Sequence, residues 1–328
     1  MAALKLAGCE PPLRCVATEV GRPWDRSPPE MSQRLLVVTP VHNEAAHIER
    51  VVHGMASQAR RPDRWVIVDD ASADDTLARL RSITADLDFI TVLEAPRRAQ
   101  EPGGDRLLFA AEVHAFTHGL ESVDWRSFSH IAKLDGDIEL PPEWYGTLLT
   151  RFADDPRLGI AGGQLSETVD GIERRIPIPS HHVHGALKTY ALECLLEIGG
   201  LQSRLGWDSI DEAYARMHGW STCSFEDLSA VHHRPLASRD GVLRGRARHG
   251  ACAYITHQGL GWVSARAFKV GRARPVGIGG AAFLYGYLHA ALGSTTAVED
   301  PELRRFVRGE LRGRMRRAVR PPALGRAR

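Results

Sequence analysis

The sequence predicts an α/β protein whose open, mostly parallel β-sheet is flanked by helices. Three observations support this class. Short continuous apolar runs, which are typical of strands buried on both faces of a sheet, recur along the chain from residue 35. Segments with apolar residues at helical spacing follow these runs. The two kinds of segment alternate, as they do in proteins built of strand–helix–strand units.

The first strands and helices are the clearest. Residues 35–41 (LLVVTPV) and 65–70 (WVIVDD) are predicted to be strands. Between them, apolar residues stand at i, i+3, i+4 and i+7 from Ile48 to Met55, so we expect an amphipathic helix there. A second helix is expected in the segment 72–83.

The remaining elements follow by the same criteria. Further strands are predicted over residues 90–95, 130–138 and 159–165. Helices are expected over 107–120, after Pro141 and Pro142, and near 185–200. The segment RRAQEPGGDR has the composition of turns, so we expect a loop over 97–106.

The formal charge of +2 conceals an uneven distribution. Residues 1–233 carry 23 Lys and Arg against 35 Asp and Glu, whereas residues 234–328 carry 19 against 5. A strongly basic segment in a chain of ordinary composition indicates a surface that meets an anionic partner. We predict three parts: a disordered extension over 1–33, an α/β domain over 34–240, and a basic, partly apolar region over 241–328.

The cysteines and the N-terminus bear on the cellular compartment. The five cysteines show neither CxxC spacing nor a compact framework, so no zinc site or disulfide scaffold is predicted, and a reducing compartment fits best. The opening residues lack the apolar core of a signal peptide, so we expect a cytoplasmic protein. Residues 1–30 contain five prolines and Met31 directly precedes the first strand, which makes Met31 an alternative start.

Asp135 and Asp137 follow an apolar run and are separated only by Gly136. In an extended backbone, residues two apart point to the same face. Two carboxylates placed in this way repel each other unless a cation lies between them and a ligand, and glycine lets backbone and ligand approach closely. The pattern predicts a divalent metal site completed by diphosphate oxygens; the alternative is an ordinary polar turn.

Polar clusters follow three of the predicted strands. TPVHNE ends the first strand, VDDAS ends the second, and LDGDIE ends the strand that begins at residue 130. In an open α/β sheet, ligands bind outside the carboxyl ends of the strands. Carboxylates at this edge can accept hydrogen bonds from a nucleotide base and from ribose hydroxyls, a role that suits Glu44 and Asp70.

As a set, these motifs resemble the P-x-x-N-E, V-D-D-x-S-x-D and D-x-D signatures of family 2 glycosyltransferases with the glycosyltransferase-A fold. The resemblance covers about residues 34–235. It implies a hexosyltransferase-like enzyme with a nucleotide-sugar donor, an inverting transfer to a hydroxyl, and a Mg²⁺ or Mn²⁺ ion. Carried over by position, it places Pro40, Asn43, Glu44, Asp70 and Asp135 in the donor pocket, and Asp135 and Asp137 at the metal.

The resemblance also implies a catalytic carboxylate at a helix start that follows a Gly-Gly turn. The turn at 199–200 precedes the segment WDSIDE, in which Trp207 stands where the family has the first acid of an E-D pair. Asp208 is the preferred base, and Asp211 is the alternative, because positions 208, 211 and 212 share one helical face and the register is open by one turn. Helix capping and a favourable interaction with the helix dipole are alternative roles for these acids.

Two groups of histidines are candidates for further roles. His233, or its neighbour His232, lies about 25 residues after the proposed base, where related transferases place a third metal ligand. The alternative is a structural histidine whose hydrogen bonds are satisfied. The histidines within 181–184 are assigned to the border of an acceptor pocket or to no catalytic role.

The basic C-terminal region resembles a membrane-surface anchor. Residues 275–293 lack formal charge but contain five glycines and His289, so we expect a buried or interfacial helix rather than a bilayer span. After Asp300, ten arginines stand against two glutamates. We therefore expect an anionic membrane surface, at the inner face, as a partner. Nucleic acid is not expected, because no DNA- or RNA-binding signature accompanies the charge.

The leading hypothesis is a metal-dependent glycosyltransferase that acts on a lipid-linked or polysaccharide acceptor in polysaccharide biosynthesis. A D-x-D phosphohydrolase with Asp135 as nucleophile is one alternative, but that chemistry needs the motif on the first strand. A non-catalytic, nucleotide-binding scaffold that docks on acidic lipid is the other alternative.

Overall fold

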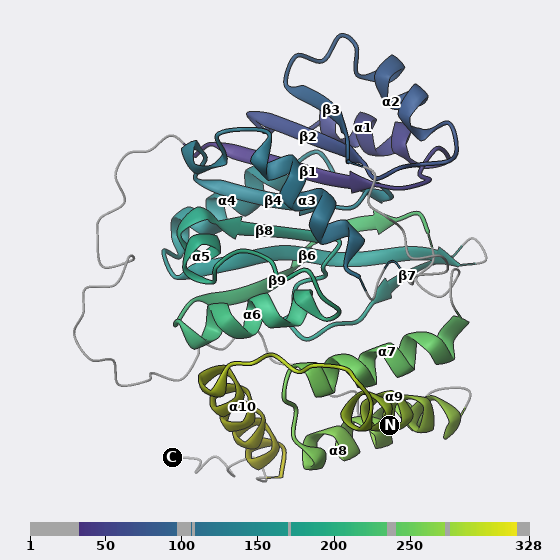
Figure 1. Ribbon diagram of the computed structural model, residues 1–328. Coiled ribbons are helices and arrows are strands. Elements are labelled where there is room, and N and C mark those ends of the chain that lie inside the picture. The colour runs from purple at the N-terminus through teal and green to yellow at the C-terminus, as the bar shows by residue number, and fades with distance from the viewer. Residues whose placement is uncertain are drawn as a thin grey trace. The chain divides into compact units, whose positions relative to one another are not determined.

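The computed structural model of the protein describes residues 33–96, 106, 109–169, 172–234, 241–272 and 276–319. These residues form two compact units (Figure 1). The first unit comprises the described residues up to Ser203 together with His218–Arg234, and the second comprises Arg204–Met217 and the described residues from 241 onward. The predicted extension, apart from residue 33, and the predicted loop at 97–106, apart from Arg106, lie outside the described residues.

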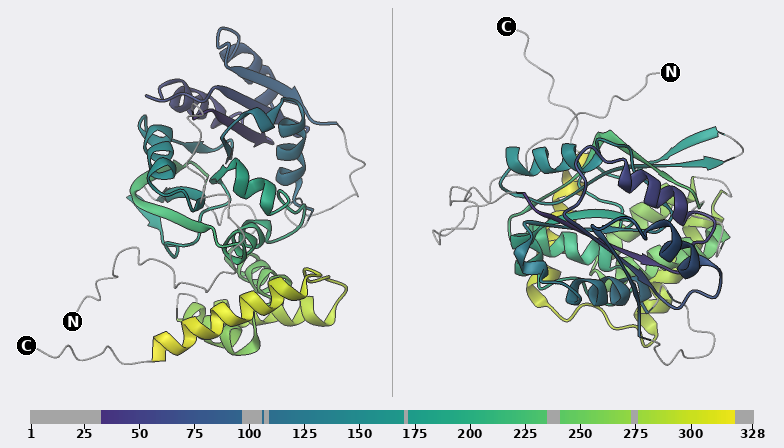
Figure 2. Two further views of the ribbon diagram at one scale, coloured as in Figure 1. Left: turned by 90° about the vertical axis from the view of Figure 1, so that its left-hand side faces the viewer. Right: turned by 90° about the horizontal axis from the view of Figure 1, so that it is seen from above.

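The first unit is built on a single β-sheet, to which the described residues contribute nine strands. The order across the sheet is β3-β2-β1-β4-β8-β6-β9-β5, and β7 pairs with β6 away from this path, as a hairpin that projects from the rest of the sheet (Figure 2). The strands are β1 (Leu35–Val41), β2 (Arg64–Asp69), β3 (Ile90–Glu94), β4 (His130–Leu134), β5 (Ile138–Glu139), β6 (Leu158–Val169), β7 (Ile172–Ile176), β8 (Leu187–Ala191) and β9 (Ser221–His232).

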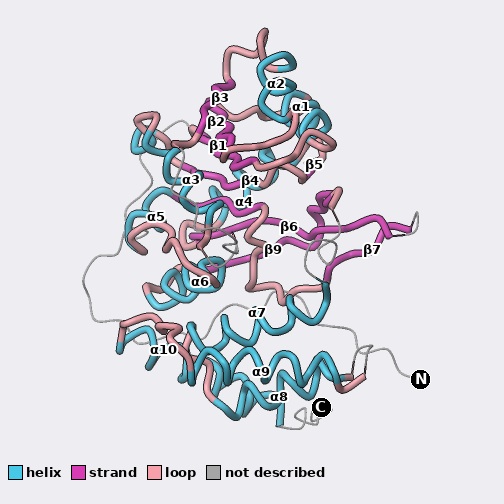
Figure 3. Tube along the Cα trace, turned by 45° about the vertical axis from the view of Figure 1, so that its right-hand side comes forward, coloured by secondary structure: helices cyan, strands magenta, loops and turns pink. Residues whose placement is uncertain are grey.

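The part of the sheet from β3 to β4 is parallel, and the first antiparallel pair joins β4 to β8. Every residue of β1 is buried, because this strand has neighbours on both sides and lies inside the protein. Figure 3 shows α1 and α2 on one side of β1–β3 and α3 on the other. The predicted α/β class, with a helix-flanked sheet that begins at residue 35, is confirmed.

The helices of the first unit fit closely against this sheet. A Cβ atom on Gly119 would lie 2.6 Å from Val38 Cγ1 and 2.8 Å from Val68 Cγ2, so only glycine lets α3 approach β1 and β2 this closely. On α1, the residues from Ile48 to Met55 that stand at the predicted helical spacing are buried. The α-helices of this unit are α1 (Ile48–Ala56), α2 (Thr76–Ile83), α3 (Ala111–Glu121), α4 (Trp144–Asp154) and α5 (Leu192–Glu197).

The segment near 185–200, predicted to be one helix, divides into strand and helix. Residues 187–191 form β8, which pairs with β4 on one side and β6 on the other, and only residues 192–197 are helical, in α5. Leu187 to Tyr190 are all buried. The apolar spacing suits either structure, and the hydrogen bonds to two neighbouring strands, which the local sequence does not contain, decide between them.

The parallel register places three polar segments at one edge of the sheet. Val41, at the end of β1, lies beside Asp69 at the end of β2, and Val38 of β1 lies beside Lys133 near the end of β4. The chain therefore leaves all three strands at the same edge, where residues 42–44, Asp70 and the segment from Asp135 follow.

The second unit is helical. It contains α6 (Trp207–Met217), α7 (Gly241–Ile255), α8 (Leu260–Gly271), α9 (Ile278–Leu292) and α10 (Pro301–Val319). Its core joins α6, α7 and α10 through a cluster of buried apolar residues: Ile210, Ala213, Ile255, Val298, Leu303, Val307 and Leu311. The expected interfacial or buried helix within 275–293 is present as α9. None of the helices in the described part of the chain combines the length and apolar character needed to cross a bilayer.

Candidate functional site

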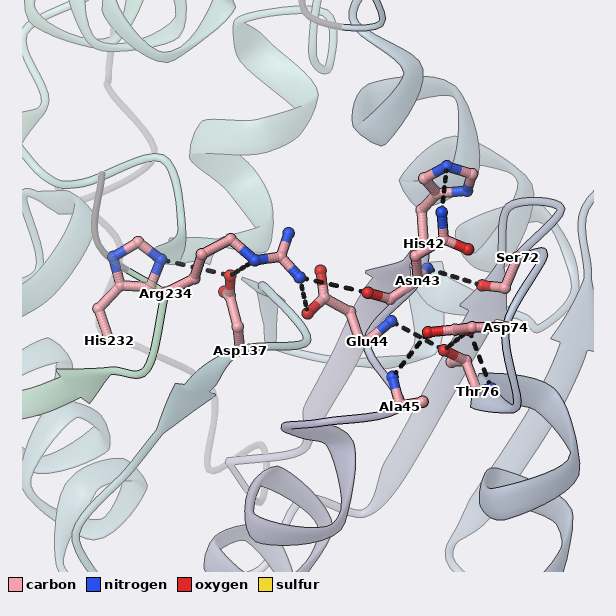
Figure 4. A network of polar contacts seen from close by, with 10 residues as sticks. All are labelled: His42, Asn43, Glu44, Ala45, Ser72, Asp74, Thr76, Asp137, His232 and Arg234. Atoms are coloured by element: carbon pink, nitrogen blue, oxygen red, sulfur yellow. Dashed lines mark hydrogen bonds and ion pairs between the residues drawn. The ribbon is translucent and has the colours of Figure 1, made fainter. Parts of the chain in front are cut away.

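Two left-handed turns bring the segments after β1 and β2 together. Asn43 and Ala71 both have φ of 57°, a conformation that is uncommon for residues with a side chain. The Asn43 amide N–H donates to Ser72 Oγ (2.9 Å), as Figure 4 shows. The Ala73 amide N–H donates to Asn43 Oδ1 (2.7 Å). The predicted donor-pocket residue Asn43 therefore also ties the two loops to each other.

Asp74 and Thr76 hold the next residues of the first loop. The Glu44 amide donates to Thr76 Oγ1 (2.8 Å), and the Ala45 amide donates to Asp74 Oδ2 (3.2 Å) (Figure 4). Asp74 Oδ1 in turn accepts from the Thr76 amide (3.0 Å). These bonds fix the backbone amides of Glu44 and of the next residue, Ala45, to the beginning of α2. The position of the Glu44 side chain is fixed with them.

Glu44 lies buried against Arg234. The Arg234 guanidinium donates from Nη2 to Glu44 Oε2 (2.5 Å) and to the Asn43 carbonyl (3.2 Å). Burial, reinforced by the nearby charge of Asp137, raises the pKa of Glu44 to about 7 although Arg234 acts in the opposite direction. Glu44 is thus a carboxyl group that changes charge near neutral pH.

Asp137 lies on the other side of Arg234. Its Oδ2 is 3.3 Å from His232 Nε2 and 3.9 Å from Arg234 Nε (Figure 4). Burial opposes ionisation of Asp137, but the hydrogen bond and the charge of His232 outweigh it and hold the pKa of this carboxyl below its usual value. For the same reason Asp137 raises the pKa of His232 against the effect of burial. The pairing of Ile138 with His232 between β5 and β9 creates this contact.

Asp135 is the most exposed acid of the group and has a different partner. Its carboxylate is ion-paired with Lys133, whose side chain is 1% exposed and also donates to the Gly185 carbonyl (3.0 Å). The charge of Asp135 contributes to the raised pKa values of Glu44 and His232, which places it in the same electrostatic environment. We refer to Glu44, Asp135 and Asp137 as the acidic cluster.

The backbone between the two aspartates differs from the expectation. Strand β4 ends at Leu134, and residues 136–137 form a turn before β5, so Asp135 and Asp137 do not continue one extended strand. A Cβ atom on Gly136 would lie 2.7 Å from Val41 Cγ1 and 3.2 Å from Glu44 Cγ. Gly136 is therefore required by packing against the β1 segment, a contact that cannot be read from the D-x-D motif alone.

The other predicted donor-pocket residues lie along the same edge. Pro40 belongs to β1 and pairs with Val68 of β2. Asp70 directly follows β2, and its largely buried carboxylate is ion-paired with Arg106. His42 Nδ1 lies 2.8 Å from the Asp70 carbonyl. Hence every residue predicted to bind the donor lies at or beside the carboxyl ends of β1, β2 and β4.

The two neighbouring histidines have separate partners. His233, the predicted metal ligand, lies with Nε2 2.7 Å from Glu139 Oε2 and stacks on His47 at 6.0 Å between ring centroids. His232 is the one beside Asp137, and its buried Nδ1 has no hydrogen-bond partner within the described part of the chain. Of the two positions considered from the sequence, the structure therefore brings His232 to the acidic cluster.

The donor set of this cluster suits a hard divalent cation only in part. Carboxylate oxygens are the ligands that Mg²⁺ and Mn²⁺ prefer, and imidazole nitrogen is compatible with Mn²⁺. Across the described ranges, however, no three or more His, Cys, Asp or Glu side chains converge closely enough to hold a metal ion. A divalent ion held by Asp135 and Asp137 would therefore need oxygen ligands from a substrate phosphate to complete its coordination, with His232 beside Asp137.

Asp208 and Asp211 lie on α6, in the second unit. Asp208 is partly exposed in the first turn, and its charge acts with burial to raise the pKa of the Cys252 thiol to about 12. Asp211 is 3% exposed, and its Oδ1 accepts from the Glu212 amide (2.6 Å). Of the two candidate bases, Asp208 is the one that solvent or a ligand can reach.

Glu212 has a structural role in the same helix. It is buried and lies 3.6 Å from Arg216, whose Nε donates to Glu310 of α10 (3.0 Å). Burial opposes ionisation of Glu310, but Arg216 and Arg314 outweigh it and lower its pKa. This ion-pair chain holds α6 to α10 within the second unit.

Sequence reasoning did not identify two basic residues of the site, Arg234 and Lys133. A signal for each is present, because Lys133 stands two residues before Asp135 and Arg234 directly follows the two histidines. Neither motif shows which acid each cation meets. That follows from the turn after β4 and from the pairing of β5 with β9.

Residues 36–190 match the family model described as Glycosyl transferase family 2. The matched segment contains the whole acidic cluster, together with Pro40, Asn43 and Asp70, and it ends before His232, Arg234 and α6. No curated protein matches the chain.

Two solved glycosyltransferase structures resemble the chain in fold. One is the mannosyltransferase PcManGT from Pyrobaculum calidifontis in complex with GDP-Man and Mn²⁺, which is 19% identical, with a TM-score of 0.51 over 91% of this chain and 81% of that one. The other is GalNAc-T7 with UDP, GalNAc and Mn²⁺, which is 15% identical, with a TM-score of 0.57 over 87% of this chain and 55% of that one. These likenesses, together with the family match, confirm the predicted glycosyltransferase-A fold.

Proposed function

We propose that this glycosyltransferase, whose residues 36–190 match the Glycosyl transferase family 2 model, moves a sugar from a nucleotide-sugar donor to an acceptor hydroxyl with inversion at the anomeric carbon. The observation that carries the proposal is the acidic cluster of Glu44, Asp135 and Asp137. It gathers at the carboxyl edge of β1 and β4, inside the segment that matches the family. That edge is where ligands bind in sheets of this kind.

The donor nucleotide is assigned to the edge formed by β1 and β2. Asp70 and Glu44 supply carboxylates that can accept from ribose hydroxyls and base N–H groups, and Pro40 and Asn43 complete the wall. Two observations support a nucleotide-sugar donor: the PcManGT structure contains GDP-Man, and the GalNAc-T7 structure contains UDP and GalNAc. Arg106, which pairs with Asp70, is positioned to adjust how that carboxylate meets the ribose.

A divalent ion, Mg²⁺ or Mn²⁺, is assigned to Asp135 and Asp137. In this proposal the imidazole of His232 holds the Asp137 carboxylate, and His233 lies in the adjacent contact with Glu139. The Mn²⁺ in both related structures supports the use of a divalent ion. When bound, such an ion neutralises the negative charge that grows on the leaving nucleoside diphosphate.

Arg234 is proposed to bind the donor diphosphate. Its guanidinium lies between Glu44 and Asp137, where it balances two carboxylates. A guanidinium forms paired hydrogen bonds to phosphate oxygens as well as to carboxylates, so the same side chain can exchange one partner for the other. If Arg234 left Asp137 for a phosphate oxygen of the donor, the Asp137 carboxylate could bind a cation instead.

Asp208 is proposed as the general base, with Asp211 as the alternative. The base takes the proton from the acceptor hydroxyl as that oxygen bonds to the anomeric carbon, while the bond to the diphosphate breaks on the opposite side. Asp208 is the more suitable because it is partly exposed, whereas Asp211 is buried and accepts a backbone N–H. Removing a general base costs roughly 10²- to 10⁴-fold in rate.

The acceptor is proposed to be a lipid-linked sugar or a growing polysaccharide. This assignment rests on the basic and apolar character of the region from residue 241, which would bring the enzyme to a membrane that carries such acceptors.

A thermal-shift panel with nucleoside diphosphates and nucleotide sugars, each with and without Mn²⁺, tests the donor and the ion together. We expect at least one guanosine or uridine nucleotide to raise the melting temperature by about 5 °C at saturation in the presence of Mn²⁺. The Asp137→Asn variant should lose the Mn²⁺-dependent part of this shift. If no nucleotide stabilises the protein with or without Mn²⁺, the donor assignment is wrong.

Two matched variants test the base. Asp208→Asn should lower kcat by roughly 10²- to 10⁴-fold and leave donor affinity unchanged. Asp211→Asn should affect turnover less, because the Asp211 side chain is buried and its Oδ1 accepts the Glu212 backbone N–H. The opposite pattern, with turnover lost in Asp211→Asn at unchanged stability, would transfer the role to Asp211.

A further inference from the structure

Helix α9 presents a row of exposed apolar side chains. Five large apolar residues of this helix are at least one-third exposed: Ile278 (53%), Leu284 (37%), Tyr285 (63%), Leu288 (49%) and Leu292 (86%). Spaced at three, four and seven residues, they fall on one side of the helix, which we call the outer face of α9. Single exposed apolar residues are ordinary, but a continuous row of five on one helix is not.

The opposite side of α9 is fully used in packing. A Cβ atom on Gly286 would lie 1.9 Å from the Ala247 carbonyl oxygen, and one on Gly250 would lie 1.9 Å from the Phe283 carbonyl oxygen. Backbones of α7 and α9 therefore touch through these two glycines. Since α9 is apolar on both sides, packing within the second unit explains the apolar side that faces α7 and leaves the outer face unexplained.

The helices around this face carry positive charge and no negative charge. From residue 241 to residue 298 the sequence contains seven Lys and Arg but no Asp or Glu. Lys269 of α8 and Arg272, which directly follows this helix, are exposed, and the Arg272 guanidinium lies 5.9 Å from the ring centroid of Phe268, which is itself 72% exposed. Arg272 directly follows Gly271, which contacts Gly280 of α9, so a cation stands beside the beginning of α9.

Charge decides which partner suits this surface. A second copy of the chain would bring two acid-free, basic surfaces together, and like charges at an interface oppose association. An anionic bilayer offers both complements at once, because its headgroups attract Lys and Arg while its acyl boundary accepts apolar side chains. At 1.5 Å per residue, the 15 residues of α9 extend about 22 Å, less than the roughly 30 Å of a bilayer core, so the helix would lie along the membrane surface.

We propose that the outer face of α9 docks on an anionic lipid bilayer, with its apolar side chains at the acyl boundary and with Lys269 and Arg272 at the headgroup phosphates. Tyr285 suits this position because its ring is apolar and its hydroxyl is polar. Two weak signals, apolar burial and attraction to anionic lipid, together give stable but reversible attachment. The inference deepens the acceptor assignment, which rests on the same region, and it does not depend on the proposed donor site or on the transfer step.

Co-sedimentation of the full chain with vesicles of phosphatidylglycerol and phosphatidylcholine tests the proposal. We expect the protein to sediment with vesicles that contain phosphatidylglycerol, to remain in the supernatant with pure phosphatidylcholine, and to be released by salt. Failure to bind the anionic vesicles, or equal binding to both kinds, would overturn the proposal.

Matched variants assign the binding to α9. The double variant Leu288→Glu, Leu292→Glu should lower the vesicle partition coefficient roughly tenfold or more. Leu196→Glu is the control, because Leu196 lies on α5 in the first unit and is 44% exposed, close to the 49% of Leu288. Equal loss in the control and the double variant would contradict a role for α9.

Two further measurements distinguish membrane docking from unfolding of the variant and from dimer formation. Circular dichroism melting of the double variant should match that of the wild type, because both positions are exposed. Sedimentation velocity should give the same mass for both proteins. If instead the wild type is a dimer that the double variant dissociates, a second copy covers this face and the proposal is wrong. Nucleotide stabilisation, measured on the same variants, should be unchanged, so a failure here is distinct from a failure of the proposed reaction.

Discussion

Arg234 is the residue on which the charge balance of the site depends. It is one cation between two buried carboxylates, Glu44 and Asp137, and the imidazole of His232 lies on the far side of Asp137. Buried carboxylates without such partners would shift toward the neutral form. The arrangement lowers the pKa of Asp137 and so favours its ionised form, whereas the pKa of Glu44 is raised to about 7.

Replacement of Arg234 by alanine should weaken donor binding. With the guanidinium gone, the diphosphate loses paired hydrogen bonds, and we expect the dissociation constant of the nucleoside diphosphate to rise roughly tenfold or more. Isothermal titration calorimetry in the presence of Mn²⁺ measures this change. Arg79→Ala on the exposed side of α2 is the matched control and should bind as the wild type does. Equal affinities of all three proteins would remove Arg234 from the donor site.

Glu44 makes stability fall as pH rises. Its pKa is 4.5 in the unfolded chain and about 7 in the folded protein, so between these values the folded state holds the proton more tightly and loses stability with increasing pH. By pH 8 the loss amounts to about 1–3 kcal/mol. Glu44→Gln should therefore be more stable than the wild type at pH 8 and similar at pH 4.5, as measured by urea unfolding without ligands. A constant difference between the two proteins across this range would contradict the raised pKa.

At the scale of the elements, the sequence predicts those strands and helices whose formation depends on their own residues. All seven residues of β1 are buried and five of them are Leu or Val, and their run in the sequence coincides with the strand. In contrast, β8 follows from its two neighbours, β4 and β6, and the prediction of a helix there is wrong. The spacing of apolar residues indicates whether a segment has helical or strand periodicity. It does not predict a strand that forms because it hydrogen-bonds to strands distant in the sequence.

The same limit applies to the site. The three polar segments at strand ends predicted the location of the acidic cluster, because parallel strands end at one edge. The partner of each acid depends on turns and cross-strand pairs: Gly136 packs on Val41, Lys133 reaches Asp135, and β5–β9 pairing selects His232 over His233 at Asp137. Of these contacts, only the one between Lys133 and Asp135 joins residues that are close in the sequence, and the motif does not show that their side chains pair.

Packing between α7 and α9 should be sensitive to one methyl group. Gly286→Ala places a Cβ atom against the Ala247 carbonyl, and because both partners are backbone the helices must separate, at a cost of about 1–3 kcal/mol or more. Gly245→Ala is the matched control on α7, where a Cβ atom meets nothing within 4 Å, and should stabilise by roughly 0.5–1 kcal/mol. Chemical unfolding monitored by circular dichroism compares the two. Similar effects of both substitutions would contradict the close contact.

At the scale of the whole molecule, the two proposed ligands belong to different units. The acidic cluster lies in the first unit, and the outer face of α9 lies in the second. The charge of the sequence divides in a similar way, with an excess of acids before residue 234 and an excess of bases after it. Each unit has its own buried core, so each can respond to its own ligand.

Hydrogen exchange should show this division. A nucleotide with Mn²⁺ is expected to slow exchange at the ends of β1 and β2 and to leave α9 unchanged. Anionic vesicles are expected to slow exchange in α9 and to leave those strand ends unchanged. Mass spectrometry of peptides from residues 35–45 and 278–292 measures both effects. Protection of both peptides by the nucleotide alone would show that the units do not respond separately.

Lys133 and Arg234 give the acidic cluster its own internal counter-ions. One is anchored beneath Asp135 by the Gly185 carbonyl, and the other is held by Glu44 and the Asn43 carbonyl. Because these charges are covalently part of the chain, they stay when every small molecule has diffused away. The acidic cluster can therefore keep its arrangement after the product has left and before the next donor binds.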